Sequence, residues 1–262
     1  MAIHPGPLLQ LVNLVPGDIL VEYDDTPDHS LMWVGGTKPI VHSAEAQTSG
    51  ILRQSARGMG GNGPACHEVY RANSPTLAQY AVAIACKWAV ASDDPRYVLF
   101  KTDERLQEFA LNLMTRFSQD RLGGDGGLWS NREPFVRAVR AYCRSYTGEP
   151  LSAGEGVTCS QFISYTYQAA SISRLAHLHA HTRVVVQEAI ARQVVANLHS
   201  AQAYAAAVAS LRPIYNSVNE TMPAPFKVDA KITSVDRLTL DLRTKPGFAH
   251  VGNLGSPDDD SD

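Results

Sequence analysis

The stretch GEGVTCSQFISYTYQAA, residues 154–170, joins a glycine-rich turn to an apolar helix, and Cys159 lies at the junction. Thr158 can accept a hydrogen bond from a backbone N–H of a first helical turn, so the pattern predicts Thr158 as the N-cap and Cys159 as the first helical residue. The helix dipole favours a thiolate at that position, which makes a cysteine nucleophilic near neutral pH. The same pattern is typical of a buried cysteine in an ordinary core helix, so this stretch alone leaves both interpretations open.

The composition is that of a globular protein with one sizeable core, because 262 residues are 44% hydrophobic and 19% charged. A net charge of -3 without clustered basic residues argues against nucleic acid or an anionic membrane as a partner. No run approaches the roughly 20 apolar residues of a membrane span. The four cysteines form neither a CxxC pair nor a disulfide framework, so free thiols are expected; they are Cys66, Cys86, Cys143 and Cys159.

The first 18 residues are not expected to be a signal peptide. They lack a basic start, and Asn13 and Pro16 interrupt their apolar run. We therefore expect synthesis in the cytoplasm, and any action outside it would need a dedicated export route.

The first part of the chain predicts an antiparallel sheet. Alternating apolar residues between turn signals indicate four strands, at 18–23, 30–35, 40–44 and 67–72. The GGTKP segment supplies a hairpin turn between the second and third strands. Residues 50–65 are predicted to be a loop. Its GMGGNG segment lacks the strand and helix that flank a dinucleotide-binding loop, so we interpret it as flexible.

The rest of the chain is predicted to be mostly helical. Ser74 and Pro75 start a helix whose inward residues recur at helical spacing, and Ser130 with Glu133 forms a capping box. The predicted segments are helices at 75–91, 102–121, 130–148, 159–172 and 182–215, the last broken near Pro213, and extended segments at 226–232 and 237–242. Together these elements predict one α+β domain, residues 1–255, with a helical insertion at about 173–222 and an acidic disordered tail at 256–262.

A cysteine at a helix start needs a base within reach, and two histidines are candidates. His29 opens the second predicted strand and His42 lies on the third. Antiparallel pairing brings both to the same end of the hairpin, so one imidazole can orient the other through a ring hydrogen bond. Each histidine alone is also typical of an ordinary half-buried strand residue.

Four segments together resemble a known family: GDILVEY (17–23), DHSLMWVGG (28–36), IVHSAE (40–45) and TCSQFI (158–163). They look like the circularly permuted papain-like clan, which includes permuted NlpC-type cysteine hydrolases and lecithin:retinol acyltransferase-like enzymes. Residues 232–255 resemble the closing segment of permuted members. The similarity covers residues 16–72, about 150–172 and loosely 232–255, whereas 74–148 and 173–222 have no counterpart.

The resemblance implies a papain-like fold and a catalytic triad. His29 matches the base, His42 the orienting residue and Cys159 the nucleophile, and neither a cofactor nor a metal is expected. The backbone N–H of Cys159 is the expected oxyanion donor. Further oxyanion or substrate candidates are Tyr23, Glu45 and Gln161; Glu45 could replace His42 if the hairpin register shifted.

The leading hypothesis is a cysteine hydrolase that forms a covalent acyl-enzyme on an amide of a cell-wall-type peptide. Such an enzyme could act as a secreted antibacterial toxin, with an immunity or delivery partner. One alternative is a lipid acyl hydrolase (phospholipase) or an acyltransferase. An alternative from another class is a non-catalytic binding module with the same fold.

Two further patterns have both a functional and an ordinary interpretation. His177, His179 and His181 would share one face of an extended segment, as metal ligands do, but a polar loop is the favoured interpretation because no Cys, Asp or Glu completes a set nearby. The consecutive residues Val184, Val185 and Val186 give the insertion a wide apolar arc. That arc predicts either a helix buried on two sides or a lid over the acyl site.

Overall fold

The computed structural model describes residues 2–43, 51–56, 59–91, 135, 138–142, 158–191, 201–230 and 233–256. The predicted helix at 102–121, the capping box at Ser130 and the acidic residues 257–262 lie outside this part of the chain. Glu45 and Cys143 lie outside it as well.

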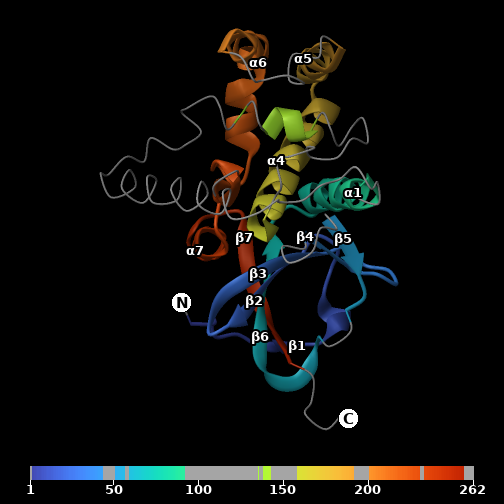
Figure 1. Ribbon diagram of the computed structural model, residues 1–262, viewed down its shortest axis with the longest axis vertical. Helices are drawn as coiled ribbons and strands as arrows, with labels where there is room; N and C mark the ends of the chain where they lie inside the picture. Colours follow the sequence, from blue (N-terminus) through green and yellow to red (C-terminus); the bar gives the residue numbers. More distant parts are fainter. Residues whose placement is uncertain are drawn as a thin grey trace, which may run out of the picture.

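A seven-stranded sheet forms one layer of the molecule, in the order β1-β7-β6-β2-β3-β4-β5 (Figure 1). The strands are β1 (Leu8–Leu9), β2 (Ile19–Asp24), β3 (Thr26–Trp33), β4 (Ile40–Ser43), β5 (Ile51–Gln54), β6 (Gly61–Ala72) and β7 (Phe248–Gly255). All paired neighbours are antiparallel except β1, which runs parallel to β7. The α+β class is therefore confirmed, and the sheet is mixed because of its short edge strand.

Helices cover one side of this sheet. They are α1 (Pro75–Ala91), α4 (Cys159–Leu178), α5 (Ala180–Ala191), α6 (Ala201–Thr221) and α7 (Val235–Thr244), with the short 3-10 turn η2 (Ala224–Phe226). The 3-10 turn η1 (Leu11–Asn13) lies on the opposite face, where Leu11 packs against a smaller cluster that includes Leu20 and Leu31. The N-terminal end of α4 lies at the sheet, and its C-terminal end leads to α5 at the far end of the molecule (Figure 1). Helix α1 packs beside α4 and over β5.

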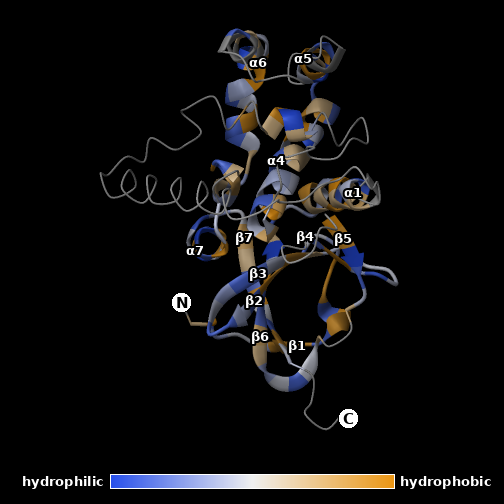
Figure 2. Cartoon of the chain, in the orientation of Figure 1, coloured by the Kyte–Doolittle hydropathy of each residue, from blue (hydrophilic) through white to orange (hydrophobic). Residues whose placement is uncertain are grey.

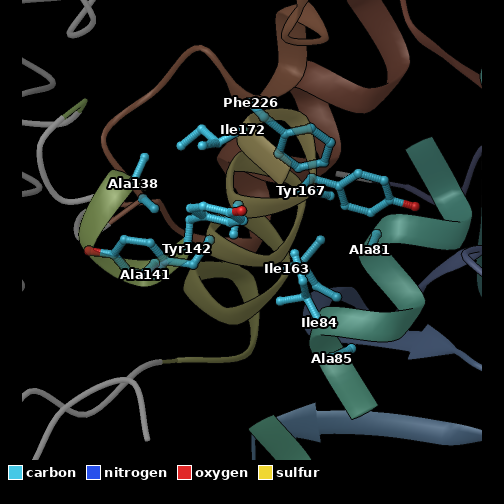
Figure 3. Packing of buried hydrophobic residues seen from close by; sticks show 14 of the residues in the cluster. Ala81, Ile84, Ala85, Ala138, Ala141, Tyr142, Ile163, Tyr167, Ile172 and Phe226 are labelled. Carbon is cyan, nitrogen blue, oxygen red and sulfur yellow. The ribbon is translucent and has the colours of Figure 1, made fainter. Parts of the chain in front are cut away.

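The larger core lies between helices and sheet. Apolar side chains of β2, β3 and β4 meet α1 and α4 there, and Figure 3 shows Ile84 of α1 close to Ile163 of α4. The Tyr167 ring stacks on Phe226 with centroids 4.7 Å apart and an interplanar angle of 4°. Helix α1 is hydrophobic along most of its length (Figure 2), which suits a helix packed in this core.

The start and inward face of α1 are as predicted. The backbone N–H of Leu77 donates to the Ser74 hydroxyl over 3.3 Å, and Pro75 is the first helical residue. The predicted inward residues are all buried: Leu77, Ala81, Ile84 and Trp88. The described part of the helix predicted at 130–148 likewise buries Phe135, Val139 and Tyr142.

The prediction of a loop over residues 50–65 is wrong. Residues Ile51–Gln54 form β5, which pairs with β4, and β6 already begins at Gly61 and pairs with β7. Both segments are strands because neighbouring strands supply their hydrogen bonds, β4 for β5 and the C-terminal β7 for β6, which local composition does not reveal.

The predicted extended segments near the C-terminus are also wrong. Residues 237–242 lie in α7, because the Ser234 hydroxyl accepts from the backbone N–H of Arg237 and caps the helix. Leu238 and Leu242, four residues apart, are both buried on one helical face. Residues 224–226 form η2, and the final strand is β7.

The predicted break at Pro213 does not occur, since α6 continues through it to Thr221. A proline inside a helix costs about 3 kcal/mol. Pro213 is solvent-exposed, and Leu211, Ile214 and Val218 on the other side of the helix are buried in the larger core, which offsets that cost.

The apolar arc of the insertion is only partly buried. Val186 is packed in the larger core, whereas Val184 is 50% exposed. Within the described residues, no helix combines the length and hydropathy needed to cross a membrane.

Candidate active site

The start of α4 has the predicted cap. Thr158 is extended, and its hydroxyl accepts from the backbone N–H of Gln161 over 3.4 Å. In return the side-chain oxygen of Gln161 accepts from the backbone N–H of Thr158 over 3.1 Å, which completes a capping box. Cys159 is the first helical residue, as predicted, and its side chain is fully buried. Gln161, a substrate candidate by sequence, thus uses its carbonyl oxygen to hold the cap.

Tertiary contacts fix this end of the helix. The Ser160 hydroxyl donates to the carbonyl of Thr233 over 2.7 Å, and Phe162 and Ile163 are buried in the larger core. Helix α4 packs against β3 and β4, the two strands that carry the candidate histidines. The fold therefore brings the cysteine helix and the histidine hairpin together.

The two histidines are in direct contact. Nε2 of His29 lies 2.9 Å from Nδ1 of His42, with ring centroids 5.1 Å apart and nearly perpendicular planes. In the antiparallel register of β3 and β4, Met32 is paired with Val41. If that register is continued, His42 lies two residues from the position directly opposite His29. The two histidines are therefore diagonal neighbours on the same face of the sheet. When His29 is protonated, its Nε2–H donates and His42 accepts, which leaves Nδ1 of His29 for proton transfer.

Comparisons with protein-family models, with curated proteins and with solved structures find no match. The chemistry of the site must then be derived from its own residues.

A row of titratable residues that sequence reasoning missed crosses the sheet beside His29. Glu22 on β2 is paired with His29 on β3 and with His67 on β6. Sγ of Cys66 lies 3.1 Å from Nδ1 of His67. The sequence pattern predicts both strands, at 18–23 and 67–72. It does not show that these two strands pair with each other, so the row was not predicted.

The environment keeps His67 and Cys66, at the β6 end of this row, uncharged. Burial lowers the pKa of His67 to about 4, and the charge of His29 adds to the effect. Burial, followed by the charge of Glu22, raises the pKa of the Cys66 thiol. The Cys66–His67 pair is therefore a neutral thiol and a neutral imidazole near pH 7, not an activated nucleophile.

Tyr23, an oxyanion candidate by sequence, is held in a buried ion-pair network. Arg243 of α7 donates to the Tyr23 hydroxyl over 2.7 Å and forms a salt bridge with the buried Glu68 of β6. Burial, followed by the charge of Glu68, raises the pKa of Tyr23. Tyr70 donates to the same Glu68 carboxylate. The Tyr23 hydroxyl is thus engaged by structural partners, and a role in the oxyanion site stays a prediction.

His177, His179 and His181 do not lie in a polar loop, so that prediction is wrong. Helix α4 continues to Leu178, His179 is its C-cap, and α5 begins at Ala180. Among the described residues, no group of three His, Cys, Asp or Glu side chains is placed to hold a metal ion. Cys66, Cys86 and Cys159 are free thiols.

Proposed function

We propose that this chain is a cysteine hydrolase of the circularly permuted papain-like kind, with Cys159 as nucleophile, His29 as base and His42 as the residue that orients His29. The observation that carries the proposal is the 2.9 Å contact between Nε2 of His29 and Nδ1 of His42. An imidazole held at one nitrogen presents the other in a fixed direction, as a general base requires.

The position of Cys159 supplies the second half of the argument. As the first residue of α4 it lies where the helix dipole stabilises negative charge, and the capping box fixes that first turn. Its backbone N–H belongs to the first turn, whose amides lack acceptors within the helix, so it is suited to stabilise an oxyanion. One such donor typically contributes about 3 kcal/mol to lowering the barrier.

The reaction has two steps. The Cys159 thiolate adds to an acyl carbonyl, His29 gives its proton to the leaving amine, and a thioester forms. His29 then takes a proton from water, whose oxygen attacks the thioester, and Cys159 leaves as a thiolate. The products are a carboxylic acid and an amine, and no cofactor takes part.

The substrate that we propose is an amide of a cell-wall-type peptide. Purified protein is incubated with peptidoglycan and, separately, with phospholipid vesicles, and the products are identified by mass spectrometry. The proposal predicts new peptide ends from peptidoglycan, lost in Cys159→Ala and retained in Cys86→Ala, which removes a half-buried thiol on α1. Fatty-acid release from vesicles would instead indicate a lipid acyl hydrolase, and no product from either would indicate a binding module.

A cell-based test follows from the same substrate. Expression directed to the bacterial periplasm should arrest growth or lyse the cells, whereas cytoplasmic expression should be tolerated. Cys159→Ala should abolish the effect. Equal toxicity of that variant would contradict catalysis as the cause.

A further inference from the structure

Glu22 lies at the centre of the row that crosses the sheet beside the proposed base. On one side it is paired with His29, and on the other with His67. Residues directly opposite each other in antiparallel strands share one face of the sheet, with Cβ atoms about 4.5–5.5 Å apart. The Glu22 carboxylate and the His29 imidazole are therefore cross-strand neighbours.

The row holds few charges at neutral pH. His67 is 5% exposed and is kept neutral by burial, and the neighbouring Cys66 thiol stays protonated. Nδ1 of His42 on β4 lies 2.9 Å from Nε2 of His29, within hydrogen-bond distance. An imidazolium at His29 would then face the Glu22 carboxylate across β2 and β3.

Other acidic groups near this row are paired or lie in solvent. Asp18, four residues before Glu22 and just ahead of β2, is bound by Arg71 over 2.7 Å; it lies roughly 13 Å away along the chain direction. Glu68, adjacent to His67 and hence on the other face, is bound by Arg243. Asp24, Asp25 and Asp28, near the turn before His29, are exposed, so solvent and salt screen their charges.

We propose that Glu22 is a positioning residue that stabilises the protonated form of His29, so that the imidazolium persists beside the Cys159 thiolate. The inference rests on the proposed hydrolase. A carboxylate opposite an imidazole favours the charged ring, and a half-buried carboxylate is screened less than an exposed one. Glu22 is the direct cross-strand partner of His29, so the charge of the Glu22 carboxylate acts on the His29 imidazole.

The test measures the titration of His29 by NMR in the full chain, with the His29 signal assigned by comparison with His29→Gln. Glu22→Gln should lower the pKa of His29 by roughly half a unit to one unit. Glu22→Asp, which keeps the charge, should restore most of the shift. Asp24→Asn, which removes an exposed carboxylate from the same strand, should produce a clearly smaller change.

The rate of Cys159 alkylation against pH gives a second readout. In Glu22→Gln its alkaline limb should move to lower pH by the same amount as the His29 pKa. An unchanged His29 pKa in Glu22→Gln, or an equal shift in Asp24→Asn, would overturn the role of Glu22 and leave the hydrolase standing. Alkylation of Cys159 that does not depend on His29 at all would instead defeat the hydrolase.

Discussion

Nε2 of His29 and Nδ1 of His42 lie 2.9 Å apart, although 13 positions separate the two residues in the sequence. The contact exists because β3 and β4 pair as antiparallel neighbours and hold both imidazoles on one hairpin. A protonated His29 thus has a half-buried hydrogen-bond acceptor at His42, which leaves its other ring nitrogen for the cysteine.

Removal of His42 should therefore impair catalysis more than folding. In His42→Ala we expect kcat/KM to fall roughly 100-fold, because His29 loses the partner that fixes its orientation and tautomer. His42→Gln, which can still accept a hydrogen bond, should lose less. Steady-state kinetics on a substrate identified by the product analysis proposed above, with a melting curve for each variant, provides the measurement. Equal activity of wild type and His42→Ala would contradict the role of His42.

The capping box should contribute to stability. Thr158→Ala removes the hydroxyl that accepts from the backbone N–H of Gln161, so the free energy of unfolding should fall by about 1 kcal/mol. Thr158→Ser keeps that hydroxyl and should remain close to wild type. Urea denaturation of the three proteins measures the difference, and a loss of equal size in the serine variant would show that the methyl group matters instead.

His67 should make stability depend on pH. Its pKa of about 4 in the folded protein lies below the ordinary value of 6.5, so its contribution is complete above pH 6.5 and is lost as pH falls toward 4. At roughly 1.4 kcal/mol per unit, the full loss is about 3 kcal/mol. His67→Gln should flatten the slope of the unfolding free energy over this range.

The exposed His181 provides the control for that experiment. His181→Gln should keep the wild-type slope, because its side chain is exposed in the folded protein. If both variants retain the wild-type slope, burial of His67 is not what makes stability fall with pH.

The buried ion pair of Glu68 and Arg243 should show strong coupling. The Glu68 side chain is fully buried and that of Arg243 is 14% exposed, so Glu68→Gln leaves a mostly buried guanidinium without its counter-charge. We expect that single change to cost about 3 kcal/mol of unfolding free energy, and Glu68→Leu with Arg243→Met to cost less than the sum of its two single changes. Strictly additive losses in a double-mutant cycle would contradict the coupling.

The same pair predicts weakening in acid. Although burial alone would raise the pKa of Glu68, its hydrogen bonds from Arg243 and Tyr70 hold that pKa below its ordinary value. A carboxyl of this kind stabilises the protein above its unfolded pKa, near 4.3, and the contribution disappears as pH falls through the lower folded value. Glu68→Gln should therefore lose less stability than wild type between pH 5 and 2 in a denaturant series.

Local signals in the sequence were sufficient for elements with their own caps and periodicity. Thr158 at the start of α4 and Ser74 before α1 both predicted helix starts that the structure confirms. The cap at Ser234 was an equally local signal, but the alternation in RLTLDL suggested a strand. Leu238 and Leu242 also fit one helical face, and burial of that face determines the outcome.

Elements that depend on pairing with another strand could not be predicted in the same way. β5 is a strand because it pairs with the preceding β4, and β6 extends back to Gly61 because β7, from the C-terminal part of the chain, lies beside it. The place of Glu22 between His29 and His67 likewise follows from the order β6-β2-β3, which no local pattern specifies. The hairpin contact of His29 and His42 was predictable because a short turn fixes it.

The rate at which iodoacetamide alkylates Cys159 at pH 6, measured by peptide mass spectrometry in wild type and in His29→Ala, tests the central claim most directly. Burial raises the pKa of the Cys66 and Cys86 thiols, and neither lies at the start of a helix, where the dipole favours a thiolate, so both should react slowly. The proposal predicts that Cys159 of the wild type reacts before either of them, and that His29→Ala slows Cys159 at least about tenfold. A Cys159 rate that is unchanged by His29→Ala, or uniform labelling of the cysteines, would contradict it.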